Sequence, residues 1–213
     1  NSGPVRIRDL EVQAGDVKIL QSLTFEAPAN KISCIIGPNG AGKTTLLNAM
    51  TGVMTVNQGS VEVSARPIEH LKIHEALSAG IGRKLQVPAI FNDLTVEENL
   101  QVASIAGRAS RLDFFRKSTL VWKTETHSML VDNNKTGLLR SLNYRAGELS
   151  QGHKQFLEMA LALGPSPSIV LLDEPTAGMS RDDTQLMIEI IKDYQKKFNA
   201  LILVIEHDMR LIE

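Results

Sequence analysis

The chain has 213 residues, of which 43% are hydrophobic and 22% charged, with 23 Lys and Arg against 24 Asp and Glu. This composition is typical of a globular protein of one or two domains, and it excludes collagen-like, coiled-coil and wholly disordered chains. The net charge of −1 provides no bulk attraction to nucleic acid or to an anionic membrane. A single cysteine excludes an intrachain disulfide, and no apolar run approaches the roughly 20 residues of a transmembrane helix. We therefore expect a soluble, intracellular protein.

The N-terminal third predicts two strands joined by a tight turn, followed by further short elements. Residues 5–13 and 17–26 carry apolar side chains at about every second position, on either side of Gly15 and Asp16. Residues 60–63 alternate like a short strand, and residues 68–79 have helical spacing.

Within the same third, residues 31–36 form a nearly continuous apolar run. Such a run predicts a strand that is buried on both faces, which places Cys34 in the core. A glycine-rich turn leads from this strand into a helix expected over residues 43–51 and ended by Gly52.

In the middle of the chain, from about residue 96 to residue 163, helical spacing replaces strand signals. Thr95 is expected to cap one helix, and residues 111–130 predict another, followed by a loop over residues 132–137. A further helix is expected over residues 150–163, because the sequence Gly-Pro-Ser-Pro that follows it stops a helix.

The last part of the chain returns to short apolar strands separated by a helix. Strands are expected at residues 169–172 and 201–205, with a helix over residues 181–198 between them. This alternation predicts an α/β fold with a parallel sheet, which the middle block of helices interrupts.

The turn after residues 31–36 carries the most specific motif of the chain. Residues 37–44 read Gly-Pro-Asn-Gly-Ala-Gly-Lys-Thr and fit the pattern G-x-x-x-x-G-K-[ST] between a strand and a helix. The glycines allow backbone N–H groups to surround phosphate oxygens at the positive end of a helix. Lys43 would reach the β- and γ-phosphates, and the Thr44 hydroxyl would bind Mg²⁺. The alternative, a glycine-rich turn with an accidental lysine, does not account for the complete match, so we predict a nucleoside triphosphate site.

Two acidic residues follow the strand at residues 169–172. Ligands of open parallel sheets bind at the carboxyl ends of the strands, so Asp173 and Glu174 are expected near the phosphate loop. Asp173 is suited to hold Mg²⁺, and Glu174 to orient or deprotonate an attacking water. Without the phosphate loop, an acidic strand end would indicate only a solvated terminus.

Residues 149–155, Leu-Ser-Gln-Gly-His-Lys-Gln, complete the set of motifs. They resemble the signature of ABC ATPases, usually written LSGGQ, with Gln151 and His153 as variants. Five motifs follow in the order of that family and cover nearly the whole chain: the phosphate loop, Gln86, the signature, the acidic strand end and His207. The resemblance implies a P-loop NTPase (RecA-like) α/β core with an N-terminal antiparallel β subdomain and an inserted α-helical subdomain.

The resemblance also implies functional roles. Gln86 would contact Mg²⁺ and the lytic water, and His207 would contact the γ-phosphate. Ser150 and Gly152, at the start of a helix, would complete the site of a second subunit in a head-to-tail dimer that encloses two ATP molecules, although Ser150 also fits a plain helix cap. The residues expected to act in catalysis are Glu174, His207, Gln86 and Lys43. The residues expected to contact the nucleotide are Gly37, Pro38, Asn39, Gly40, Ala41, Gly42, Lys43, Thr44, Thr45, Ser150, Gln151 and Gly152. The expected magnesium ligands are Thr44, Gln86 and Asp173.

Three stretches narrow the family branch. Residues 34–37, 80–86 and 206–209 together resemble bacterial importers of urea and of branched-chain amino acids. Gly-Arg-Lys at 82–84 and the segment 173–179 look most like the urea importer subunit, with a branched-chain amino acid importer as the alternative.

Two positions depart from the family pattern: Ala14 replaces an aromatic residue that stacks on adenine, and Ser180 replaces an aspartate. Ser180 also fits the cap of the helix that follows it.

The expected protein is an ATP-hydrolysing transport subunit with ATP and Mg²⁺ as cofactors. Its partners would be a second ATP-binding subunit, identical or related, membrane permeases and, indirectly, a solute-binding protein, on the inner face of the cell membrane. The domains would be an ATP-binding core at 1–86 and 165–213 and a helical signature subdomain at 87–164. Because family members continue beyond the His207 motif, the chain is expected to lack a C-terminal part.

Two rival functions differ in class from transport. An ATP-driven nucleic-acid or chromosome machine usually has long heptad arms or tandem ATPase units, and this chain has neither, so no nucleic acid is expected. A non-hydrolysing, ATP-dependent interaction module would fit the departures at Ala14 and Ser180, whereas Glu174 and His207 argue against it.

Overall fold

A computed structural model describes residues 3–68, 81–84, 90–106 and 136–206. The expected helices at 68–79 and 111–130 lie almost wholly outside the described residues, as do Gln86 and His207. The strands are β1 (Val5–Ala14), β2 (Val17–Ala27), β3 (Ile32–Ile35), β4 (Gln58–Val63), β5 (Arg66–Pro67), β6 (Ile81–Lys84), β7 (Ile169–Asp173) and β8 (Leu201–Ile205). The helices are α1 (Lys43–Met50), α3 (Val96–Ala106), α5 (Gln151–Leu163) and α6 (Arg181–Phe198), with 3-10 turns η3 (Leu138–Ser141) and η4 (Ala146–Glu148).

The strands form two sheets of different kinds. The N-terminal sheet has the order β2-β1-β4-β5, and its strands pair antiparallel. The second sheet has the order β3-β8-β7-β6, and all its pairs are parallel. The predicted α/β fold with an N-terminal antiparallel subdomain is therefore confirmed.

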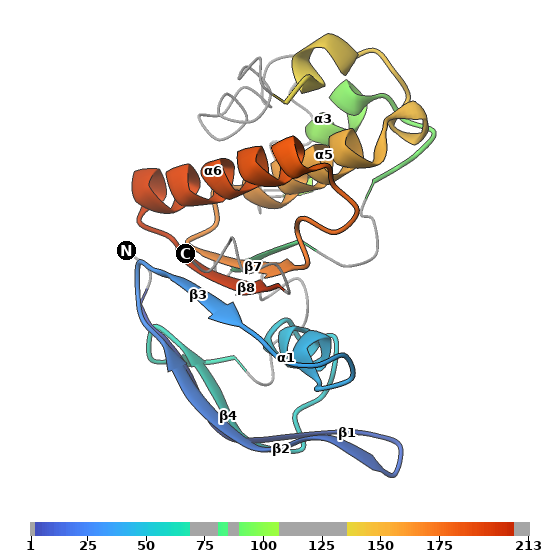
Figure 1. The fold of residues 1–213 in the computed structure, drawn as a ribbon. Coiled ribbons are helices and arrows are strands. Elements are labelled where there is room, and N and C mark those ends of the chain that lie inside the picture. Colours follow the sequence, from blue (N-terminus) through green and yellow to red (C-terminus); the bar gives the residue numbers. More distant parts are fainter. Residues whose placement is uncertain (1–2, 69–80, 85–89, 107–135, 207–213) are drawn as a thin grey trace.

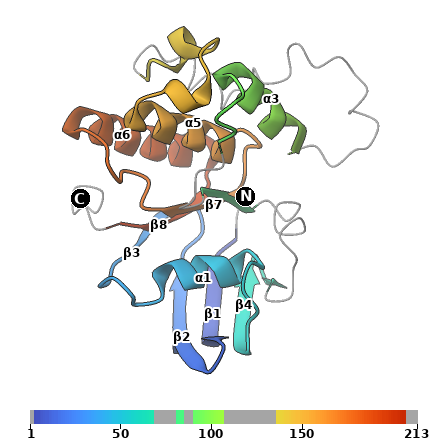
Figure 2. The same cartoon turned by 90° about the vertical axis from the view of Figure 1, so that its right-hand side faces the viewer.

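Helices cover both faces of the parallel sheet (Figures 1 and 2). Figure 1 shows α1 between the antiparallel sheet and the parallel strands, while α5 and α6 lie on the opposite side. The two cores follow from strand alternation: Ile169 and Leu171 pack with α1, whereas Val170 and Leu172 pack on the side of α5 and α6. All five residues of β7 are buried, as expected for a central parallel strand.

The predicted helix boundaries agree with the capping chemistry. Thr95 and Glu98 form a reciprocal capping box, in which each backbone N–H donates to the other side chain. Ser150 caps α5 by accepting from the N–H of His153, and Ser180 caps α6 by accepting from the N–H of Asp183. The simple capping roles of Ser150 and Ser180 are confirmed.

One expectation about the core is wrong. The strand within residues 31–36 is not buried on both faces, because among the described residues β3 pairs only with β8 and forms the edge of the parallel sheet. Its four residues are half-buried, Cys34 among them, and Ile36 is 57% exposed. An apolar run alone does not distinguish a central strand from an edge strand that is partly covered by other segments.

Candidate nucleotide-binding site

Four strand ends meet along one edge of the parallel sheet. The register pairs Ile35 of β3 with Ile205 of β8, and Ile205 with Asp173 of β7. Since all four strands run in the same direction, the segments after β3, β8, β7 and β6 emerge at this edge. Among the described residues, these segments are the phosphate loop after β3, Glu206 after β8, and Glu174 after β7, whose last residue is Asp173.

The phosphate loop turns directly into α1. Gly40 and Gly42 have φ values of 82° and 83°, in the left-handed region that favours glycine. A Cβ atom on Gly42 would also lie 2.7 Å from Leu20 Cδ2, so the Leu20 side chain of β2 would have to shift to admit one. The first turn of α1 contains no acidic residue, and its N-cap, Gly42, forms no side-chain capping bond. The helix thus presents uncapped N–H groups to an anion.

Lys43 closes over its own loop. Its Nζ donates to the carbonyl oxygens of Gly37 at 2.7 Å and Pro38 at 2.9 Å. An ammonium group that is held within the loop, next to uncapped N–H groups, suits the negatively charged phosphates of ATP. These features fit a nucleoside triphosphate.

Asp173 provides the observation that fits a metal ion. It is 1% exposed, and neither carboxylate oxygen has a hydrogen-bond partner among the described residues. An unpaired buried carboxylate is costly unless a cation neutralises it. Over the described chain no three His, Cys, Asp or Glu side chains cluster to hold a metal. Mg²⁺ is usually bound by one or two protein oxygens together with water and phosphates, so Asp173 and Thr44 would be sufficient protein ligands.

Glu174 has a strained backbone. Its φ is 48°, and for a residue other than glycine this conformation costs about 1–3 kcal/mol and persists only where the surroundings enforce it. The Glu174 N–H donates to Ile205 O at 2.9 Å, and Ala177 N donates to Glu174 O at 3.2 Å. The half-buried Glu174 therefore begins a tight turn that is tied to the end of β8.

The signature segment starts α5 and lies against the start of α6. A Cβ on Gly152 would lie 2.8 Å from Asp183 Oδ2, and a Cβ on Gly178 would lie 3.5 Å from Gln151 Cγ. Ser150 and Gln151 are exposed, whereas Gly152 is partly covered. A side chain at Gly152 would therefore require the Asp183 carboxylate to move.

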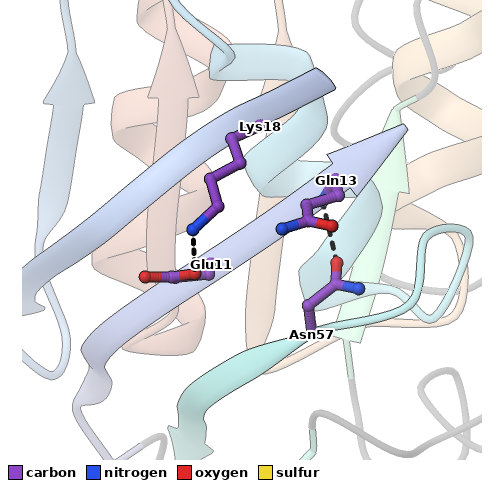
Figure 3. Close-up of polar contacts among 4 residues, drawn as sticks. All are labelled: Glu11, Gln13, Lys18 and Asn57. Carbon is purple, nitrogen blue, oxygen red and sulfur yellow. Dashed lines mark hydrogen bonds and ion pairs between the residues drawn. The ribbon is translucent and has the colours of Figure 1, made fainter. Parts of the chain in front are cut away.

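The hairpin between β1 and β2 carries Ala14, where the family resemblance would place an aromatic residue. Ala14 is exposed and pairs with Val17, which is 66% exposed. Figure 3 shows the polar contacts that fix this end: Gln13 N donates to Asn57 Oδ1 at 2.8 Å, and Lys18 Nζ lies 3.2 Å from Glu11 Oε2. These contacts fix the hairpin around Ala14, whose side chain is only a methyl group.

Glu206 was not identified from the sequence as a site residue. It directly follows β8, is 4% exposed, and accepts hydrogen bonds from Thr176, two residues after Glu174. An acidic residue directly after an apolar strand, as at Asp173, is the signal that could have found it. Nearby, burial raises the pKa of the Cys34 thiol, and the charge of Glu206 raises it further.

Comparisons with known proteins show the family of this chain. The profile of the ABC transporter family matches residues 20–177. The high-affinity branched-chain amino acid transport ATP-binding protein LivG of Salmonella typhimurium is 32% identical, over 97% of this chain and 82% of that protein. The corresponding protein BraF of Pseudomonas aeruginosa is 28% identical, over 98% and 83%.

Solved structures with a similar fold are also ATP-binding cassettes of ABC transporters. An ATP-binding cassette of an ABC transporter in its ADP conformation is 27% identical and superposes with a TM-score of 0.78, covering 98% of this chain and 82% of that one. A nucleotide-free cassette gives a TM-score of 0.80 at 27% identity, over 98% and 83%. The chain belongs to the ABC transporter ATP-binding family, and it is an ATPase that uses ATP with Mg²⁺. No helix within the described residues is both long enough and apolar enough to cross a membrane.

Proposed function

We propose that this chain is the ATP-hydrolysing subunit of an importer of the branched-chain amino acid branch. The observation that carries the proposal is the shared sheet edge, where the phosphate loop follows β3 and β7 ends at Asp173, next to Glu174. The similarity to LivG and BraF supports the choice of branch.

We assign the residue roles as follows. The N–H groups of the phosphate loop and Lys43 hold the phosphates, because the loop ends in an uncapped helix N-terminus. Asp173 and Thr44 hold Mg²⁺, which neutralises charge on the phosphates. Glu174 orients the attacking water and accepts its proton. Gln86 and His207, outside the described residues, are assigned to the water and the γ-phosphate by their place in the motif order.

The proposed assembly is a head-to-tail pair of ATP-binding subunits, docked on permeases at the inner face of the membrane. Ser150, Gln151 and Gly152 would then contact the nucleotide of the neighbouring subunit, since α5 presents a helix N-terminus next to these residues. We propose residues 1–86 and 165–213 as the ATP-binding core and residues 87–164 as the signature subdomain.

Phosphate release from the purified chain, alone and with its permeases, tests the catalytic proposal. We expect Glu174→Gln to abolish release while the protein still binds a fluorescent ATP analogue, because the phosphate loop is unchanged. Glu189→Gln, an exposed glutamate on α6, serves as the matched control and should behave as the wild type. Phosphate release that survives Glu174→Gln would contradict the role of Glu174.

A second experiment tests the transported solute. Cells that lack this subunit should lose uptake of labelled leucine and regain it with the wild-type chain, but not with Glu174→Gln. Urea is the second candidate, because the sequence at 82–84 and 173–179 resembles the urea importer subunit. Loss of urea uptake with normal leucine uptake would favour urea and reject the amino acid branch.

A further inference from the structure

Glu206 is a buried carboxylate with a defined partner. Thr176, which is 8% exposed, donates its backbone N–H to Glu206 Oε1 at 3.2 Å, and its hydroxyl donates to the same oxygen. Both residues are shielded from water, where a charged group requires hydrogen bonds to be tolerated. The two segments are 30 residues apart in sequence, so the contact joins the end of β8 to the turn after β7.

The same turn is tied to β8 a second time through the backbone. Glu174 N donates to Ile205 O at 2.9 Å, directly before Glu206. Residues 174–177 are therefore fixed at both Glu174 and Thr176 by two consecutive residues of one segment. These two attachments help to hold Glu174 in its left-handed conformation, because a strained residue persists only where several contacts fix it.

We propose that Glu206 is a positioning residue for ATP hydrolysis: through Thr176, its carboxylate fixes the turn that holds Glu174 at the sheet edge. Glu206 contacts no reacting atom in this scheme. It acts by restricting where the Glu174 carboxylate is placed. The inference rests on the proposed function, since it requires that Glu174 acts on the attacking water.

The kinetic test uses Thr176→Val, which removes the hydroxyl donor at nearly constant volume, and Thr176→Ser, which retains it. We expect kcat for ATP hydrolysis to fall about tenfold to a hundredfold in Thr176→Val with KM unchanged, because misplacement of a catalytic group affects the chemical step. Thr176→Ser should restore most of the activity. Thr184→Val, a buried threonine on α6, is the matched control for loss of a buried hydroxyl.

A double-variant cycle then identifies the partner. If the Thr176 hydroxyl acts only through Glu206, the variant carrying both Thr176→Val and Glu206→Ala should be no slower than Glu206→Ala alone. Additive losses in kcat, or an unchanged kcat in Thr176→Val, would overturn the proposal.

Amide hydrogen exchange provides a readout that does not depend on hydrolysis. Thr176→Val should speed exchange at the N–H of Glu174, which is bonded to Ile205 O, while the amides of α6 stay protected. Unchanged exchange at Glu174 would reject the positioning role even if the wild-type chain hydrolysed no ATP. Absence of hydrolysis with faster exchange would instead reject the proposed function and leave the positioning of the turn supported.

Discussion

Asp173 and Glu206 are two buried carboxylates at the ends of neighbouring strands, yet their surroundings differ. Asp173 is 1% exposed and neither of its oxygens has a hydrogen-bond partner among the described residues, whereas Glu206 is 4% exposed and accepts two hydrogen bonds from Thr176. Burial alone therefore does not reveal what an acidic residue does. A carboxylate without protein partners is available to a cation, while one with partners holds the backbone in place.

The largest difference between Asp173 and Glu206 is expected in Mg²⁺-dependent hydrolysis of ATP. Asp173→Asn should lower Mg²⁺-stimulated phosphate release by about a hundredfold or more, because it removes a charged ligand of the metal that stabilises the phosphates. Phosphate release at increasing Mg²⁺ concentrations measures this. The same Mg²⁺ dependence in variant and wild type would show that Asp173 is not a ligand.

Removal of the partnered carboxylate should instead destabilise the fold. Glu206→Ala leaves the N–H and hydroxyl of Thr176 buried without an acceptor, so we expect the free energy of unfolding to fall by about 2–3 kcal/mol. Urea titration followed by circular dichroism, without nucleotide, gives this value. An unchanged midpoint would mean that Thr176 finds other partners and that the contrast with Asp173 does not hold.

Removal of the charge on Asp173, the carboxylate without a hydrogen-bond partner among the described residues, should instead stabilise the fold. Asp173→Asn relieves an uncompensated buried charge, and we expect the free energy of unfolding to rise by about 1–2 kcal/mol when Mg²⁺ is chelated. A gain in stability together with a loss of activity is the pattern of a residue retained for function. A destabilised Asp173→Asn protein would indicate that the carboxylate has a structural partner.

The smallest effect on stability is expected at the opposite end of the sheet. A buried hydrogen bond there serves as a reference for the loss of a polar group far from the site. Tyr194 is fully buried on α6, and its hydroxyl donates to Pro167 O at 2.8 Å, just before β7 begins. Tyr194→Phe should cost about 1 kcal/mol of stability with no change in kcat, because the bond lies far from the strand ends that carry the site. Reduced kcat in this variant would mean that general loosening of α6 also affects hydrolysis.

The phosphate loop and the acidic pair could be proposed from the sequence because their signals are local. The phosphate loop is a contiguous motif, and Asp173 and Glu174 directly follow an apolar strand, so residue type and spacing are sufficient to find them. β6 was missed because its sequence, Ile-Gly-Arg-Lys, contains one apolar residue and has no strand-like alternation. Glu206 also directly follows an apolar strand, but its bond to Thr176, 30 residues away, is visible only in the fold.

The sequence by itself determined the family and most of the order of elements, and it predicted the phosphate loop, because these depend on residues that are adjacent in the chain. Only the tertiary structure decided that β3 lies at an edge, leaving Cys34 half-buried, and that Asp173 has no hydrogen-bond partner among the described residues while Glu206 is bonded. The physical reason is that burial and hydrogen-bond satisfaction depend on which strands become neighbours. Strand order is set by packing over the whole chain and is not encoded in any one segment.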